Sequence, residues 1–259
     1  MRSVSGPKVS VIMNCFNGEK YLRDSLKSVY KQTYKNWELI FWDNNSTDNT
    51  YKILSKNFDK RIKYFRSEKF LKLYEARNEA VKKAKGTYIS FLDTDDIWKN
   101  NFLKKHIKCM QEFNSEIVYS KYLIKNEQNN KIYLKDEKNL ISGYLTQNLL
   151  NNYNIGIIAV MIKKNIFKKY KFNSNLNLIG DFDFFFRVSL KYRFIALNNA
   201  LAIYRFHKDN FTNRNSRIYY LEFKHWYKDN FKLIKKFSLI KIKYIIFKLR
   251  LKYYLKLIF

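Results

Sequence analysis

The sequence predicts an α/β fold with a mainly parallel sheet flanked by helices, followed by a basic and aromatic C-terminal extension. Over the first hundred residues, short apolar runs alternate strictly with segments whose apolar residues recur at helical spacing. That alternation is typical of parallel strands joined by right-handed crossovers. The size agrees, because 259 residues with 46% apolar residues can form one large α/β core and an appendage.

The first half contains four expected strands, each a short apolar run. They lie at residues 8–13, 37–42, 62–65 and 87–92. Three helices are expected between them. The first, residues 19–31, has its apolar residues on one helical face. Ser46 or Thr47 can cap the second, which runs to about residue 58. The third, residues 73–85, is followed by Gly86, a typical helix stop.

The second half is more mixed. A helix is expected at residues 100–113, and strands at residues 116–124 and 155–162. A further helix at residues 181–191 is entered through Gly180. Neither a signal peptide nor a transmembrane helix is expected, because no apolar run is long enough.

The composition changes from about Arg217. Residues 218–259 hold eleven Lys and Arg against Glu222 and Asp229, and most of the remainder is aromatic or aliphatic. Residues 239–259 show both strand and helix periods, so the pattern leaves their conformation open. One interpretation is an interfacial element on anionic lipid. The other is a solvated basic helix that packs its apolar face on the domain.

The net charge of +29 attracts phosphates, nucleic acid and anionic lipid without selecting among them. An AT-rich genome, which favours Lys, Asn, Ile, Tyr and Phe, is an equal explanation of the charge. Cys15 and Cys109 have no metal-type spacing. We expect two buried reduced thiols, as in a cytosolic protein.

Polar residues follow the expected strands. Asn14 ends the first, Asp43 and Asn44 follow the second, and Asp93 and Asp95 follow the fourth. In open parallel sheets, ligands bind at the carboxyl ends of the strands. These side chains are therefore expected to converge on one ligand-binding edge.

Five polar segments, in this order and spacing, resemble the family 2 glycosyltransferases, which are inverting enzymes with the Rossmann-like GT-A fold. The segments are residues 9–17, 41–48, 91–96, 180–183 and 204–207. The resemblance covers about residues 8–215 and implies a GT-A domain at 1–216. Within it, residues 8–98 would be the nucleotide-sugar-binding half and 99–216 the acceptor half. Residues 217–259 would be a basic amphipathic tail.

The segment at residues 91–96 can hold a divalent metal, since Mg²⁺ or Mn²⁺ takes only one or two protein carboxylates when phosphates complete its shell. It resembles the Asp-X-Asp motif of the family, which implies Asp95 as the metal ligand and Asp93 near the ribose or the metal. Residues 204–207 resemble the Tyr-Arg-X-His segment of the family, which implies that His207 completes the metal shell or contacts the diphosphate, and a structural role is the alternative for this histidine. The alternative is that Asp96 only caps the next helix.

The segment at residues 41–48 resembles the base-contacting Asp-Asp-Gly-Ser-X-Asp stretch, with Asn44 in place of the second Asp. Asn44 still accepts a hydrogen bond, but without the charge. Turn and capping duty is the alternative for this stretch, and loop support is the alternative for Arg77. The expected nucleotide-sugar-binding residues are Asn14, Asp43, Asn44, Arg77, Asp93 and Arg205.

The segment at residues 180–183 resembles the family's Glu-Asp-Tyr-Asp, which implies Asp181 as the general base and Asp183 as its substitute. The base would take a proton from the acceptor hydroxyl in a single inverting displacement. Gly180 replaces the usual Glu. The alternative is that both carboxylates only charge-match a helix N-terminus.

We therefore expect a metal-dependent inverting glycosyltransferase. It would move a sugar from a nucleotide-diphosphate donor to a growing, lipid-linked surface glycan at the cytoplasmic face of the inner membrane. The basic tail would contact the anionic membrane surface. Alternatives are another nucleotide-sugar transferase on this fold, with a protein or sugar-phosphate acceptor, a catalytically degenerate scaffold, and a nucleic-acid-binding protein. No nucleic-acid motif supports the last.

Overall fold

The computed structural model describes residues 6–56, 59–211 and 215–258. A nine-stranded sheet forms its centre, in the order β3-β2-β1-β4-β8-β6-β9-β5, with β7 paired to β6. The strands are β1 (Val9–Cys15), β2 (Trp37–Asp43), β3 (Ile62–Arg66), β4 (Tyr88–Phe91), β5 (Ile97–Trp98), β6 (Ile117–Asn126), β7 (Ile132–Leu134), β8 (Val160–Lys163) and β9 (Phe194–Phe206).

The first four strands are parallel, as the alternation predicts. The sheet as a whole is mixed, however, because β8 runs antiparallel to both β4 and β6, while β6 and β9 are parallel. The mainly parallel arrangement is therefore confined to the first half. The reason is that β8 enters the sheet through a loop and one turn of 3-10 helix, η1 (Ile157–Ala159), and not through a βαβ crossover.

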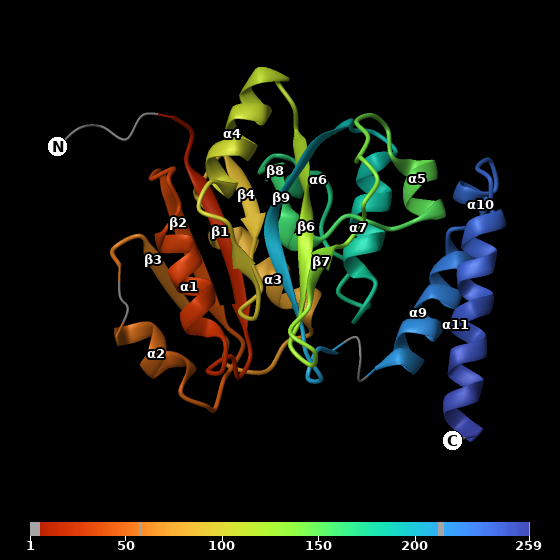
Figure 1. Ribbon diagram of the computed structural model, residues 1–259, viewed down its shortest axis with the longest axis horizontal. Coiled ribbons are helices and arrows are strands. Elements are labelled where there is room, and N and C mark those ends of the chain that lie inside the picture. The colour runs from red at the N-terminus through yellow and green to blue at the C-terminus, as the bar shows by residue number, and fades with distance from the viewer. Residues whose placement is uncertain (1–5, 57–58, 212–214, 259) are drawn as a thin grey trace.

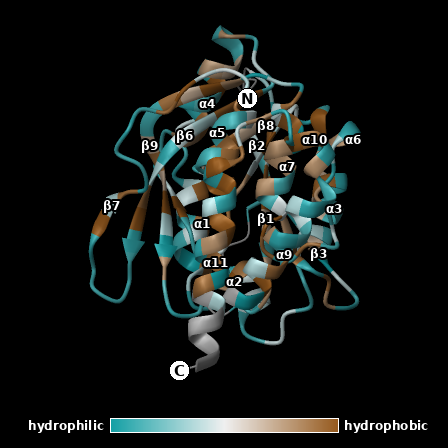
Figure 2. Ribbon diagram, turned by 90° about the vertical axis from the view of Figure 1, so that its right-hand side faces the viewer, coloured by the Kyte–Doolittle hydropathy of each residue, from teal (hydrophilic) through white to brown (hydrophobic). Residues whose placement is uncertain are grey.

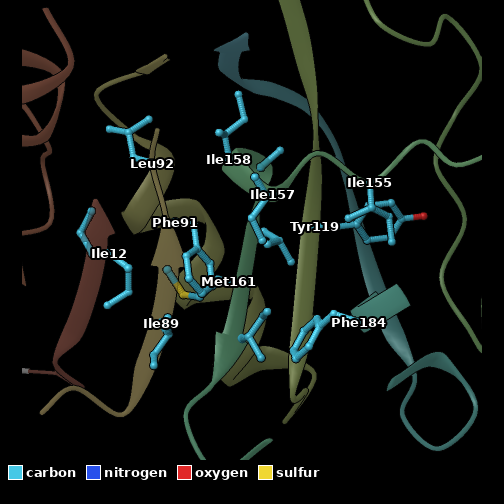
Figure 3. Close-up of a cluster of buried hydrophobic side chains, with 14 of the residues drawn as sticks. Ile12, Ile89, Phe91, Leu92, Tyr119, Ile155, Ile157, Ile158, Met161 and Phe184 are labelled. Carbon is cyan, nitrogen blue, oxygen red and sulfur yellow. The ribbon is translucent and has the colours of Figure 1, made fainter. Parts of the chain in front are cut away.

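The same turn corrects the expected strand at residues 155–162, of which only the last residues pair with neighbouring strands. A continuous apolar run does not distinguish a strand from another buried segment. Figure 3 shows Ile157 and Ile158 in the core at the end of β8, between β4 and β6.

Helices cover the sheet, and their bounds are α1 (Leu22–Tyr30), α2 (Thr50–Lys56), α3 (Leu73–Lys83), α4 (Phe102–Glu112), α5 (Thr146–Asn151), α6 (Ile166–Lys169) and α7 (Gly180–Ser189). The start of α2 and the end of α3 differ from the prediction. The second helix starts at Thr50, whose N–H donates to Asp48, and not after Ser46 or Thr47. Gly86 does not cap α3, which ends at Lys83 with Ala84 as its C-cap residue. A Cβ on Gly86 would lie 2.6 Å from the Ser10 nitrogen, so this glycine permits close approach to β1.

Helix α7 is buried on nearly every side. Its four phenylalanines, Phe182 and Phe184–Phe186, are each 3% exposed or less. A helix that is apolar all round is a core helix. Its N-terminal residues are therefore held firmly in place.

The C-terminal segment is helical: α9 (Ser216–Asp229), α10 (Phe231–Ile234) and α11 (Ile240–Ile258). In Figure 1, α9 and α11 lie side by side at the end of the molecule opposite β2 and β3. Phe223 and Trp226 of α9 are buried in the core, and so is Ile242 of α11. The segment thus packs on the domain. No helix among the described residues is both long and apolar enough to cross a membrane.

Candidate active site

A pocket of about 540 Å³ opens at the carboxyl ends of β1 and β4. It collects five of the expected site residues, Asn14, Arg77, Asp93, Asp95 and Asp181. The first four come from the nucleotide-binding half and the last from α7. Convergence at the carboxyl edge is the arrangement that the strand order predicts.

Arg77 links the two halves of the pocket. Its guanidinium donates to Asp181 Oδ1 at 2.6 Å and to both oxygens of Asp93 at 2.9 and 3.1 Å. The side chain is only 2% exposed. Burial lowers the pKa of Arg77, but the charges of Asp181 and Asp93 more than offset this and raise it. The residue is therefore a buried permanent cation shared by two carboxylates.

Asp181 is the carboxylate best suited to proton transfer. It is 20% exposed, and its Oδ2 has no donor among the described residues. Burial raises the pKa of Asp181, Arg77 lowers it, and Asp93 raises it again, with a net increase above the ordinary value. A carboxylate with a raised pKa and one free oxygen has the properties of a general base.

Asp95 faces the other end of the pocket. Its Oδ2 lies 3.0 Å from His207 Nε2 and 3.3 Å from the Asn210 amide. The Asp209 N–H donates to His207 Nδ1 at 3.2 Å. His207 is 7% exposed, so its position is well defined.

These donors suit a divalent cation of the kind that shares its shell with phosphate. A carboxylate oxygen and an imidazole nitrogen 3.0 Å apart can bind one ion, with Asp93 in the same pocket. Among the described residues, no group of three or more His, Cys, Asp or Glu side chains is arranged as a complete metal site. Most of the remaining ligands would then come from water and substrate.

Asp96 does not cap a helix, because β5 follows it and α4 begins only at Phe102. It is 1% exposed, and its Oδ1 accepts the Arg205 backbone N–H at 2.8 Å. Burial, reinforced by Asp95 and Asp93, holds the pKa of Asp96 well above its usual range. Asp96 thus ties the acidic loop to β9.

Three expected binding residues do not line the pocket. Asp43 is fully buried and accepts from the Ser46 N–H and the Tyr64 hydroxyl. Asn44 uses both amide atoms on the backbone of Leu71, donating at 2.8 Å and accepting at 3.0 Å. An aspartate at this position could not donate to the Leu71 carbonyl, which is a structural reason for Asn44.

Arg205 is the third. Its guanidinium lies over the Tyr21 ring, at 4.6 Å, and bonds Asp24 at 3.1 Å. It is 4% exposed and is not among the residues that line the pocket. The expected role of Arg205 in binding phosphate is therefore not supported by its position.

Asp183, the substitute base, also lies outside the pocket. It accepts from Arg187, at 2.7 Å, and from the Trp226 indole N–H, at 3.0 Å. It faces a second cleft of about 710 Å³ between α7 and α9. That cleft is larger, but of the residues considered for the site it contains Asp183 alone.

Sequence reasoning missed Glu222 of α9, which had been assigned to a tail. Its carboxylate accepts from the backbone N–H groups of Asn177, Leu178 and Ile179 at 2.6 to 3.2 Å. Ile179 directly precedes α7, so Glu222 holds the loop that leads to Asp181. The only signal in the sequence was the rarity of acidic residues after position 217.

Two exposed aromatic rings were also missed. Phe16 and Phe70 meet edge to face, 4.7 Å apart, and both are at least half exposed. Phe16 lines the pocket beside Asn14, whose Nδ2 is buried without a partner among the described residues. An apolar wall next to an unused amide donor suits a flat heterocycle.

Comparison with known proteins places this geometry in context. The chain is 40% identical over 166 residues to the Escherichia coli UDP-Glc:alpha-D-GlcNAc-diphosphoundecaprenol beta-1,3-glucosyltransferase WfgD, which covers 63% of each chain. The chain therefore spans less than two thirds of that relative.

Two solved structures share the fold. Residues 1–349 of S. aureus TarS, in complex with UDP-GlcNAc, have a TM-score of 0.69 at 21% identity, covering 84% of this chain and 66% of that 349-residue piece. The mannosyltransferase PcManGT from Pyrobaculum calidifontis, in complex with GDP-Man and Mn²⁺, has a TM-score of 0.63 at 16% identity. It covers 86% of this chain and 64% of that one.

The family description "Glycosyl transferase family 2" matches residues 10–191, which include the parallel strands, the acidic loop and α7. With the α/β fold of the solved structures and the pocket at the strand ends, this match settles the family. The chain belongs to glycosyl transferase family 2.

Proposed function

We propose that this protein is an inverting, metal-dependent glycosyltransferase that moves a sugar from a UDP-sugar to a hydroxyl of a lipid-linked glycan. The observation that carries the proposal is the Arg77 bridge between Asp181 and Asp93 inside the pocket. It joins a candidate base from the second half of the chain to the acidic loop of the first half.

Asp181 would take the proton of the acceptor hydroxyl as that oxygen attacks the anomeric carbon. The C–O bond to the diphosphate breaks as the new one forms, so one displacement inverts the configuration. Arg77 holds Asp181 in place through Oδ1 and leaves Oδ2 for the acceptor. The raised pKa of Asp181 makes it a stronger base than an ordinary aspartate.

Asp95 and His207 would hold Mn²⁺ or Mg²⁺, and the bound ion would neutralise negative charge on the departing diphosphate. Asn14 and the Phe16–Phe70 wall would receive the base. Asp93 lines the same pocket and forms an ion pair with Arg77, so it would contact the ribose or the ion. Asp43 and Asn44 would act by shaping the base-binding loop, through Ser46, Tyr64 and Leu71.

The UDP donor and the lipid-linked acceptor are inferred from relatives. The WfgD name specifies UDP-Glc and a diphosphoundecaprenol acceptor, and TarS is in complex with UDP-GlcNAc. The proposed place of action is the cytoplasmic face of the inner membrane, with α11 in contact with anionic lipid. Transfer to a protein or to a sugar phosphate on the same fold is the alternative.

The experiment is a donor screen by nucleotide-sugar hydrolysis, with Mn²⁺ or Mg²⁺ and then with EDTA. We expect one UDP-sugar to release UDP, and both EDTA and Asp95→Ala to abolish the release. Asp181→Asn should bind UDP as the wild type does but transfer at least about 100-fold more slowly, the usual range for a lost base. Asp183→Asn is the matched control, since that carboxylate faces the other cleft.

Hydrolysis that survives EDTA would contradict the metal role. Equal activity of Asp181→Asn and the wild type would contradict the assignment of the base. Failure to bind UDP, GDP or dTDP with metal would point to a catalytically degenerate scaffold.

A further inference from the structure

A smaller pocket adjoins the candidate active site. We propose that this second pocket holds the apolar chain of the acceptor, and that the junction of the two pockets binds the acceptor's diphosphate. The inference rests on the lipid-linked acceptor proposed above and specifies where its parts lie.

The second pocket has a volume of about 290 Å³ and lies between α5, α9 and α11. The two pockets share six lining residues: Tyr122, Lys135, Tyr153, Ile155, Phe182 and Tyr219. They are therefore neighbours, with a common wall. An acceptor that enters the candidate active site past these six shared residues would also contact the smaller pocket.

Beyond the junction, the walls of the second pocket are mainly apolar. Leu149 and Leu150 of α5, Phe223 of α9, and Ile242 and Ile245 of α11 line it. Asn152 is the one polar residue that lines the pocket beyond the junction. Such a groove stabilises a hydrocarbon chain by removing its surface from water.

The junction itself carries the chemistry that a diphosphate requires. Lys135 makes no ion pair with a carboxylate of the described residues, and it lines both pockets. The Tyr153 hydroxyl is buried and has no hydrogen-bond partner among those residues. A buried polar atom without a partner calls for an explanation, and a phosphate oxygen would supply one. The ammonium of Lys135, which lines the same two pockets, would add charge-assisted binding.

Helix α11 lines the groove on one side and carries the surface proposed to contact anionic lipid on another. Ile242 and Ile245 line the groove, and the same helix exposes Ile240, Tyr244 and Phe247 on another side, each more than half exposed. In Figure 2, α11 lies on the face turned toward the viewer, beside α9. A chain leaving the groove along α11 would emerge next to that apolar stripe.

The test uses two acceptors, GlcNAc diphosphate carrying an undecyl ester, below its critical micelle concentration, and the corresponding methyl ester. With the UDP-sugar from the donor screen, we expect the undecyl acceptor to have a KM at least about tenfold lower, because burying two methylene groups suffices for this. Ile245→Gln should remove most of that preference. Ile246→Gln, next to it but outside the groove, should keep it.

Lys135→Gln should raise the KM for both acceptors alike, since both carry the diphosphate. Equal KM values for the two acceptors, or an unchanged preference in Ile245→Gln, would overturn the inference and leave the proposed function standing. No transfer to either acceptor by an enzyme that still hydrolyses its UDP-sugar would overturn the proposed acceptor class and this inference with it.

Discussion

At the scale of single residues, the Arg77 cation organises the candidate site. It lies within 6 Å of the rings of Tyr74, Phe91 and Phe172, an environment that disfavours a bare charge. Two carboxylates compensate, and each is held in turn by the arginine. Removal of one member of such a buried set leaves the others without a partner, which makes the set a sensitive point for activity.

The first prediction concerns the pH dependence set by Arg77. The guanidinium lowers the raised pKa of Asp181, so Arg77→Met should raise that pKa further. Asp181 accepts a proton only when ionised, and activity falls as pH drops through its pKa. The acid limb of the kcat/KM profile should therefore move to higher pH in Arg77→Met, and less so in Arg77→Lys.

The control for this prediction is Arg66→Met, an arginine about half exposed that lies 3.8 Å from Asp43, outside the pocket. It should leave the acid limb in place. Thermal unfolding of each variant checks that it is folded. An unshifted limb in a folded Arg77→Met protein would show that Asp181 does not control the profile.

At the scale of elements, α9 supplies a carboxylate that the start of α7 lacks. The resemblance implies a glutamate before the base, but this chain has Gly180. A Cβ there would lie 2.4 Å from the Tyr74 ring, so the backbone passes too close for any side chain. Glu222 supplies a carboxylate to the same loop from outside, through the N–H groups of Asn177 to Ile179.

The second prediction follows from this contact. Glu222→Ala should lower kcat about tenfold, since hydrogen bonds to a charged group contribute roughly 1.5–3 kcal/mol. KM for the donor should change little, because the hydrogen bonds of the loop go to Glu222 and Tyr74 and not to the acidic motif at residues 93–95. Glu222→Gln should restore part of the activity, since its amide oxygen still accepts.

Asp229→Asn is the matched control for Glu222, because it removes another carboxylate of α9 that is exposed to solvent. A purely structural role of Glu222 would lower thermal stability and leave the kcat of the folded fraction unchanged. That result would contradict the positioning role.

At the scale of the whole molecule, positive charge and apolar surface coincide at the C-terminus. Ile240, Tyr244, Phe247 and Leu251 follow one another at intervals of three or four residues along α11, and each is 47 to 78% exposed. Such a stripe on a cationic helix is typical of an interfacial helix on anionic lipid.

The third prediction tests this surface. The protein should sediment with vesicles containing phosphatidylglycerol and not with neutral vesicles, and salt should weaken binding because it screens charge. Phe247→Glu should reduce the bound fraction. Phe113→Glu, an equally exposed phenylalanine at the end of α4, should not. Equal binding of both variants would contradict a role of α11.

The sequence predicted those parts of the fold that local pattern controls. Alternating apolar runs located β1 to β4 and the helices between them, because strand and helix periods differ. The resemblance named Asp181, Asp93 and Asp95, and the pocket brings these three together. The order of β8, β6 and β9 and the turn η1 could not be predicted, because long connections do not constrain strand direction.

What the sequence by itself determined is the parallel half of the sheet, the helices, the acidic motifs and the family to which the chain belongs. Only the tertiary structure decided how their side chains are used. It buried Arg77 between two carboxylates from distant segments, assigned Asn44 and Arg205 to internal contacts, and placed Glu222 under the loop before α7. The physical reason is that hydrogen-bond partners can lie more than a hundred residues apart along the chain, 104 for Arg77 and Asp181 and 181 for Arg205 and Asp24, and no local pattern records such a pairing.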